Sequence, residues 1–448
     1  MSRHRLTSLR RHSLSGSNKG SVWDLYATNG FLRPITNANS SVKWVEDLDG
    51  TLVQSPANKP AMPGMRLTDG VWYPTASDGS LISPISRMIR TAQGSVAEYD
   101  ETYPGVLVEP AATNKCTCRK VNPTDTTNMV LYGDVAATLT LVSDTAALTA
   151  AGLIGLCTSG NVYKLDNSGG STAAYVLCGG TVANTNSHSA GIFARGAGKL
   201  YIVGSLNSGT VFNLAIYEQA QNLNITPTST SAQLGVYCTA GQVAYFIMPE
   251  LVESSFLTSP IMPKPTEDTL AAVTRAADNV TFATPSWLLA HPNDFAVIGT
   301  VIPKTSVVGT VYALSLYQDA SNYLGIYLNA SAGALTAVKR YAGTSIYLLA
   351  STQTVNIPNQ YIFYQSALLG CGKASRTYAD GAWGDWSTWR TNADATGKGP
   401  VMASSFALGN LNSSLYLYST MPMTRILRIP TNLSAAALQA WLVAKAGE

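Results

Sequence analysis

The densest group of side chains suited to ligand binding lies between residues 378 and 390, Tyr-Ala-Asp-Gly-Ala-Trp-Gly-Asp-Trp-Ser-Thr-Trp-Arg. Sugars stack their C–H faces on aromatic rings while carboxylates and backbone groups bond their hydroxyls, so this composition is typical of a carbohydrate site. The same tryptophans also suit packing over a sheet edge or in a subunit interface, which is the favoured alternative. The candidate glycan-binding residues are Tyr378, Asp380, Trp383, Asp385, Trp386 and Trp389.

Hydrolytic chemistry is not expected. A glycosidase needs two carboxylates about 5–10 Å apart, and there is no Glu between Glu267 and Glu448. Asp380 and Asp385 are the nearest approach to a pair, and they flank a turn. No Gly-x-Ser-x-Gly sequence is accompanied by His and acid in the order of a hydrolase triad. We therefore predict no catalytic residue and no enzyme, with a polysaccharide depolymerase using Asp380 and Asp385 as the alternative.

Metal and cofactor sites are not predicted either. The four histidines are isolated, and no Cys-x-x-Cys pair is present, whereas a zinc site needs about four ligands at characteristic spacing. The glycine pairs lack the strand–loop–helix context of a phosphate loop. The sequence therefore predicts no cofactor and free thiols at its six cysteines, Cys116, Cys118, Cys157, Cys178, Cys238 and Cys371.

Charge is sparse and unevenly placed. Charged residues make up 12% of the 448, and the formal net charge is +3. Five of the 29 basic residues and none of the 26 acids fall in the first twenty positions, leaving a nearly neutral body. Such a body argues against a nucleic-acid or anionic-membrane surface, and no stretch has the 20 or so apolar residues of a membrane span. The candidate anchoring residues are Arg3, Arg5, Arg10 and Arg11.

The fold class predicted is all-β. Short runs rich in β-branched and aromatic residues recur between Gly, Asn and Ser turns, as in Lys199–Val203, Val211–Tyr217 and Tyr361–Leu368, which is typical of β-sandwiches. One helix closes the chain, because Ser434 suits an N-cap and an apolar stripe follows it at helical spacing. The stripe consists of Leu438, Trp441, Leu442 and the stem of Lys445.

Composition divides the chain into five parts. We expect a basic, extended anchoring arm over 1–41 and a small irregular β region over 42–114. A first antiparallel β-sandwich follows over 115–262, then a Pro-rich linker over 263–274. A second sandwich with the terminal helix occupies 275–448.

Four phrases carry a family resemblance. They are Thr51-Leu-Val-Gln-Ser-Pro-Ala-Asn-Lys-Pro60, Gly105-Val-Leu-Val-Glu-Pro-Ala-Ala-Thr-Asn114, Pro249-Glu-Leu-Val-Glu-Ser-Ser-Phe-Leu-Thr-Ser-Pro-Ile261 and Thr274-Arg-Ala-Ala-Asp278. In this order they resemble structural proteins of tailed bacteriophages with carbohydrate-binding-module-like and concanavalin A/laminin G-like jelly rolls. The resemblance spans about residues 42–430.

The resemblance implies a virion protein, either a tail fibre or tail-associated adhesin, or a fibre on the capsid. It implies assembly in the host cytoplasm, a homo-oligomer with a trimer as the expected form, and attachment to other virion proteins through the arm. Host surface glycan is the expected ligand. A capsid decoration protein without a ligand remains the alternative within this family.

Overall fold

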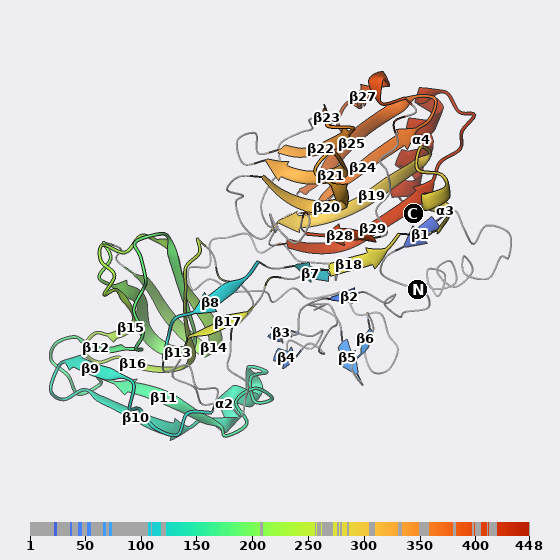
Figure 1. Cartoon of the computed structure of the whole chain (residues 1–448). Helices are drawn as coiled ribbons and strands as arrows, with labels where there is room; N and C mark the ends of the chain where they lie inside the picture. The colour runs from blue at the N-terminus through green and yellow to red at the C-terminus, as the bar shows by residue number, and fades with distance from the viewer. Residues whose placement is uncertain are drawn as a thin grey trace.

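The computed structural model describes residues 22–24, 36–37, 44–46, 52–54, 66–68, 71–73, 106–108, 110–117, 122–206, 209–255, 257, 261, 272–275, 277, 280–284, 286–303, 310–329, 334–348, 358–379, 382–396, 398, 405–409, 411 and 419–447. In these ranges every strand pair is antiparallel, and the strands gather into two β-sandwich bodies (Figure 1). The predicted fold class is confirmed. None of the helices described is long and apolar enough to cross a membrane.

The first body is one curled sheet. Its strand order is β10-β11-β16-β13-β15-β12-β9, and β14 pairs with the other edge of β13. The strands are β9 (Val130–Gly133), β10 (Thr138–Ser143), β11 (Asn161–Asp166), β12 (Ala174–Leu177), β13 (His188–Val203), β14 (Thr210–Ile225), β15 (Gln233–Cys238) and β16 (Val243–Val252).

The long ribbon of β13 and β14 turns this sheet into a sandwich. The first half of β13 pairs with β16 and the second half with β15, so the ribbon belongs to both layers. The change occurs at Gly196, which has a φ of 85° beside a register shift after Ala194. A Cβ at Gly196 would lie 2.3 Å from the carbonyl oxygen of Val243, so only glycine fits this bend.

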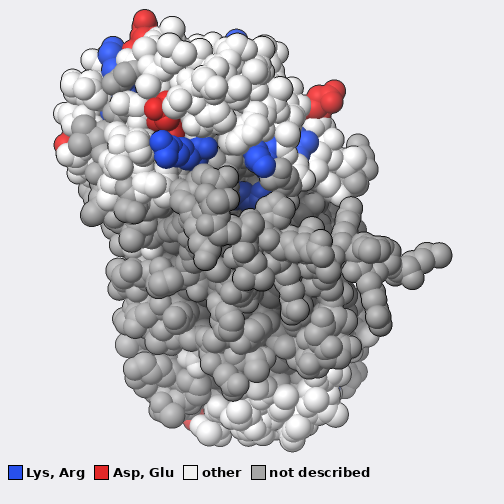
Figure 2. Space-filling model, turned by 90° about the vertical axis from the view of Figure 1, so that its right-hand side faces the viewer, with Lys and Arg blue, Asp and Glu red and all other residues white. Residues whose placement is uncertain are grey.

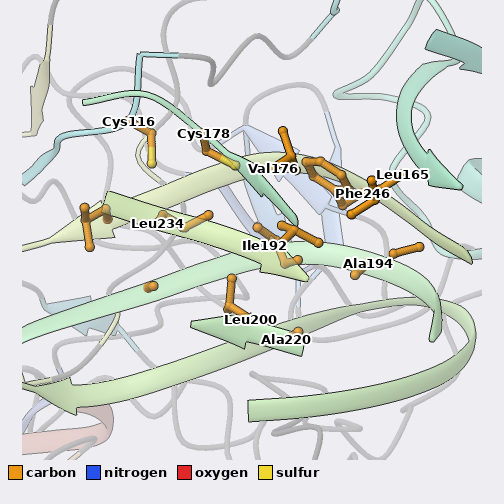
Figure 3. Close-up of a cluster of buried hydrophobic side chains, with 14 of the residues drawn as sticks. Cys116, Leu165, Val176, Cys178, Ile192, Ala194, Leu200, Ala220, Leu234 and Phe246 are labelled. Atoms are coloured by element: carbon orange, nitrogen blue, oxygen red, sulfur yellow. The ribbon is translucent and has the colours of Figure 1, made fainter. Parts of the chain in front are cut away.

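Alternate residues of the curled sheet point into the space between its layers and form the main core, which includes Ile192, Leu200 and Phe246 (Figure 3). A second cluster lies on the opposite face of β13, where Phe193 packs with Leu148 of α2 (Thr145–Ala150). Leu52 of β4 joins that cluster, and its backbone N–H donates to the Gly152 carbonyl at 3.0 Å. The cysteines in the described ranges are buried free thiols, as predicted.

The second body consists of two sheets. One has the order β1-β29-β19-β24-β25-β26, with β27 on β25 and β7 on β29; the other has the order β2-β18-β28-β20-β21-β22-β23. The first sheet contains β1 (Val22–Asp24), β7 (Val106–Val108), β19 (Phe295–Pro303), β24 (Asn359–Ser366), β25 (Gly370–Ala379), β26 (Ala382–Trp383), β27 (Arg390–Asn392) and β29 (Ser419–Arg428). The second contains β2 (Thr36–Asn37), β18 (Val280–Ala283), β20 (Thr310–Asp319), β21 (Asn322–Asn329), β22 (Ala334–Tyr341), β23 (Thr344–Leu348) and β28 (Ser405–Leu408).

Strands from the first 108 residues thus pair with the second body, a pairing that the sequence did not predict. Both β1 and β7 pair with β29, and β2 pairs with β18. Two further hairpins are described, β3 (Trp44–Glu46) with β4 (Leu52–Gln54), and β5 (Arg66–Thr68) with β6 (Val71–Tyr73). Arg3, Arg5, Arg10 and Arg11 lie outside the described residues.

A short strand pair, drawn between the two bodies in Figure 1, joins β8 (Ala112–Asn114) to β17 (Val273–Arg275). Val273 and Thr274, the last residues of the segment expected to be a linker, therefore lie in a strand. Asn114 is fully buried, and its side-chain amide donates to the Pro249 carbonyl at 3.1 Å and to the Ile261 carbonyl at 3.2 Å. Three of the four resemblance phrases meet at this point.

The predicted C-terminal helix is present as α4 (Ala435–Ala446), and the Ser434 hydroxyl accepts from the Ala437 N–H at 3.3 Å. Leu438 and Leu442 pack on the outer face of β19 and β24. The other helices described are short, α3 (Ser286–Ala290) and the 3-10 turn η1 (Ala393–Ala395). Few charged side chains appear on the face of the second body shown in Figure 2.

Two lysines are buried between the sheets of the second body. Lys339 is 1% exposed and donates to the Gln365 side chain at 2.5 Å, and Lys373 is 0% exposed and donates to the Leu335 carbonyl. Neither makes an ion pair with another described residue. Burial lowers the pKa of Lys373 to about 7 and that of Lys339 to about 8, from the ordinary 10.5.

We predict that Lys373→Met stabilises the second body near neutral pH. Between pH 7 and 10.5 the unfolded chain binds a proton that the folded chain does not, so the wild-type protein loses stability as the pH falls through this window. Methionine removes that loss, which is a few kcal/mol since one pKa unit corresponds to about 1.4 kcal/mol. Thermal unfolding from pH 6 to 10 should show the largest gain at pH 6–7 and the smallest at pH 10. An equal gain in stability at all pH values would contradict a lowered pKa for Lys373.

Candidate functional site

The predicted tryptophan segment leaves β25 and returns as β26. Tyr378 and Trp383 are cross-strand partners, with ring centroids 5.4 Å apart and planes at 84°. The Arg376 guanidinium lies 4.9 Å from the Trp383 ring centroid and 4.6 Å from that of Trp386. Asp385 is exposed, and Asp380 lies outside the described residues.

The two later tryptophans pack against the interior of the protein. Trp386 and Trp389 are half-buried against the cluster formed by β19, β24 and α4, and Trp389 lies 5.7 Å from the ring centroid of Tyr364. The structure therefore brings Tyr378, Trp383 and Trp386 together around Arg376, while Trp389 faces the helix layer. This segment does not present its rings as one open surface.

An open aromatic surface is found instead on the first body. Tyr132 of β9, Tyr175 of β12 and Tyr237 of β15 are register partners in one row across three strands. Their sequence neighbours Leu131, Val176 and Val236 belong to the main core. The tyrosines therefore point to the opposite, outer face of the sheet.

A fourth tyrosine completes this surface. Tyr201 of β13 lies opposite Gly235, where a Cβ would come within 2.9 Å of its ring. The Tyr201 ring centroid lies 6.3 Å from that of Tyr175 and 6.1 Å from that of Tyr237, in edge-on contacts. Tyr132 and Tyr175 stack at 5.2 Å with planes 18° apart. We call Tyr132, Tyr175, Tyr201 and Tyr237 the tyrosine face.

The tyrosine face is accessible and uncharged. Tyr132 is 45% exposed, and the other three rings are half-buried. Burial, followed by the neighbouring hydroxyls of Tyr175 and Tyr237, raises the pKa of Tyr201 well above its ordinary value. The face therefore offers flat apolar rings whose neutral hydroxyls can donate and accept hydrogen bonds.

The second body has tyrosines on a sheet face too, and two of them are covered. The ring centroids of Tyr312 and Tyr327 lie 5.4 Å apart with tilted planes, the Tyr312 ring lies over Gly325, and the two side chains are only 5% and 6% exposed. Tyr347 nearby is exposed. The tyrosine face differs from this cluster in that none of its four rings is fully buried, whereas two rings of the cluster are.

Sequence reasoning missed the tyrosine face because its members lie on four strands, up to 105 positions apart. Each appears as a single tyrosine in an ordinary strand run. One signal was available: along each strand, the tyrosine occupies an outward-facing position of the inward–outward alternation. This alternation identifies a shared surface only once the order of the strands is known.

The described ranges hold no group of side chains suited to a metal ion. No three His, Cys, Asp or Glu side chains lie close enough there to hold a metal ion. Asp144 is engaged in the fold, because its Oδ2 accepts from Arg195 Nε and from the Tyr217 hydroxyl, both at 2.6 Å. The Arg195 guanidinium in turn stacks 3.7 Å from the ring centroid of Tyr245.

No family model matches the chain, and no curated protein matches it. Similar solved structures include domain 4 of AbnA, a GH43 extracellular arabinanase of Geobacillus stearothermophilus in complex with arabinotriose (13% identity, 37% of this chain, 72% of that one, TM-score 0.26). The CBM40 of the Ruminococcus gnavus IT-sialidase is another (14% identity, 35% of this chain, 87% of that one, TM-score 0.25).

A third is tailspike protein 2 of Escherichia coli O157:H7 bacteriophage CAB120, at 14% identity and a TM-score of 0.27. The match covers 36% of this chain and 22% of the tailspike. At these TM-scores the likenesses decide neither a ligand nor an activity for this chain.

We predict that Trp389→Ala acts on stability. Removing the ring opens a cavity between Tyr364 and the α4 layer, and large-to-small changes of buried aromatic residues cost about 3–5 kcal/mol, so about 2 kcal/mol is expected for this half-buried side chain. Thermal unfolding should show a lower transition with carbohydrate binding retained. An unchanged transition with lost binding would place a carbohydrate site at the tryptophan segment.

Proposed function

We propose that this chain is a structural protein of a tailed-bacteriophage virion that attaches to carbohydrate through the tyrosine face of its first sandwich. The observation that carries the carbohydrate part is the accessible tyrosine face itself. Four rings gather on one sheet face, one of them 45% exposed, and grouped apolar surface of this kind marks binding sites more often than singly exposed residues do.

The chemistry of the face suits sugars. A pyranose ring presents C–H groups on its faces and hydroxyls around its rim. The tyrosine rings supply apolar contact for the former, and their phenol groups supply hydrogen bonds for the latter. Because the rings are held by strands and by Gly235, little side-chain freedom is lost on binding.

We propose binding rather than hydrolysis at this face. Asp134 follows β9 directly, but its carboxylate accepts backbone N–H bonds from Ser171 and Thr172 at 2.7 Å and from Ala136 at 2.8 Å. These bonds hold its pKa below the ordinary range, so it stays ionised and engaged. A glycosidase would need a second, opposed carboxylate.

The virion part of the proposal rests on the four phrases and their order. We propose a homo-oligomer, with a trimer as the expected form, attached to other virion proteins through the basic arm. Several weak tyrosine faces on one oligomer would then bind a polyvalent cell surface by avidity.

We predict that Tyr175→Ala, in the centre of the face, weakens carbohydrate binding. One lost aromatic contact should reduce affinity roughly fivefold to tenfold. Tyr347→Ala, an exposed tyrosine on the second body, serves as the matched control. Affinity electrophoresis against polysaccharide from the host surface measures binding, and adsorption of virions carrying each variant measures attachment.

The proposal requires loss for Tyr175→Ala with an unchanged oligomer and unchanged binding for Tyr347→Ala. If Tyr175→Ala binds as the wild type does, the tyrosine face is not the site. If the wild-type oligomer binds no polysaccharide and virions adsorb without it, the chain is a decoration protein without a ligand.

A further inference from the structure

The row of the tyrosine face continues to a cation on the next strand. Lys199 of β13 is the register partner of Tyr237, so the row across the sheet runs Tyr132, Tyr175, Tyr237, Lys199. The Lys199 Nζ lies 4.9 Å from the Tyr237 ring centroid. Lysine and tyrosines therefore share one outer surface.

Lys199 is not neutralised by its described surroundings. It forms no ion pair with another described residue. Among the described residues, the outer face around Lys199 carries no other charge. Asp134, at the far end of the row, accepts hydrogen bonds from the backbone N–H groups of Ser171 and Thr172. The described residues of this face are Val130, Tyr132, Tyr175, Leu177, Lys199, Tyr201, Val203, Val211, Gln233, Gly235 and Tyr237.

The row is long enough for more than one sugar. From β9 to β13 it crosses three strand spacings, about 14 Å at 4.7–4.9 Å each. A glycan whose sugar rings lie on the tyrosines would bring a substituent of one sugar to the ammonium of Lys199. The ammonium of the half-buried Lys199, beside an apolar platform, favours an anion there, since a charge-assisted hydrogen bond is about twice as strong as a neutral one.

We infer that the glycan bound by the tyrosine face is acidic, with a carboxylate-bearing sugar placed at Lys199. This inference rests on the proposed carbohydrate function and deepens it. The tyrosines supply affinity for the sugar rings, and Lys199 selects the charged member of otherwise similar glycans.

The test is an array of matched glycan pairs, each carboxylate-bearing glycan beside its uncharged parent, probed with the full-length oligomer. Wild type should bind the acidic members about tenfold better, the size expected of one charge-assisted contact. Lys199→Gln should bring acidic binding down to the neutral level, and Lys199→Arg should keep the preference. Lys398→Gln removes an exposed cation of the second body and is the matched control.

Raising the salt concentration from 50 to 500 mM should weaken only the binding of acidic glycans. An unchanged preference in Lys199→Gln overturns the inference. If the wild type binds both members of each pair equally and Tyr175→Ala loses this binding, the preference for acidic glycans is overturned and the carbohydrate function stands. Absence of binding to every glycan overturns both.

Discussion

The buried side chain of Asn114 fixes how the first body begins and ends. Its amide donates to the carbonyls of Pro249 and Ile261, and its oxygen accepts from the backbone N–H groups of Cys116 and Leu251 at 3.0 and 3.1 Å. A fully buried amide must satisfy all these groups at once, so an exchange for an apolar residue would leave several of them unpaired. Arg275 and Thr274 hold the neighbouring strand to β8, through the Pro110 carbonyl at 3.2 Å and the Thr113 hydroxyl at 2.8 Å. The start of the second body is thereby tied to the closing strand of the first.

The sandwich form of the first body depends on the bend of β13 at Gly196. Gly196 lets β13 pass from one layer to the other, and the second half of that strand carries both Lys199 and Tyr201 to the outer face. Gly235 then leaves the space that the Tyr201 ring occupies. The binding surface proposed above is thus a consequence of backbone geometry in which two glycines place rings supplied by four strands.

The sequence predicted the fold class and the terminal helix well, because β-branched runs, turn residues and the Ser434 cap are local signals. Half of β13 was not expected, since His188 to Gly198 is rich in Ala and Gly, and tertiary pairing on both edges makes it a strand. The tryptophans between 383 and 389 could be recognised, but the packing of Trp386 and Trp389 against the cluster of β19, β24 and α4 could not, because α4 begins only at Ala435. The tyrosine face required strand order and register, which no single run contains.

An NMR titration with host-surface polysaccharide, on protein labelled with ¹³C in its tyrosine and tryptophan rings, decides between the two candidate carbohydrate surfaces. Shifts should be confined to Tyr132, Tyr175, Tyr201 and Tyr237, with the signals of Tyr312, Tyr327 and Trp389 unchanged. Shifts at Trp383 and Trp386 with a silent tyrosine face would contradict this expectation, and would return the carbohydrate site to the second body.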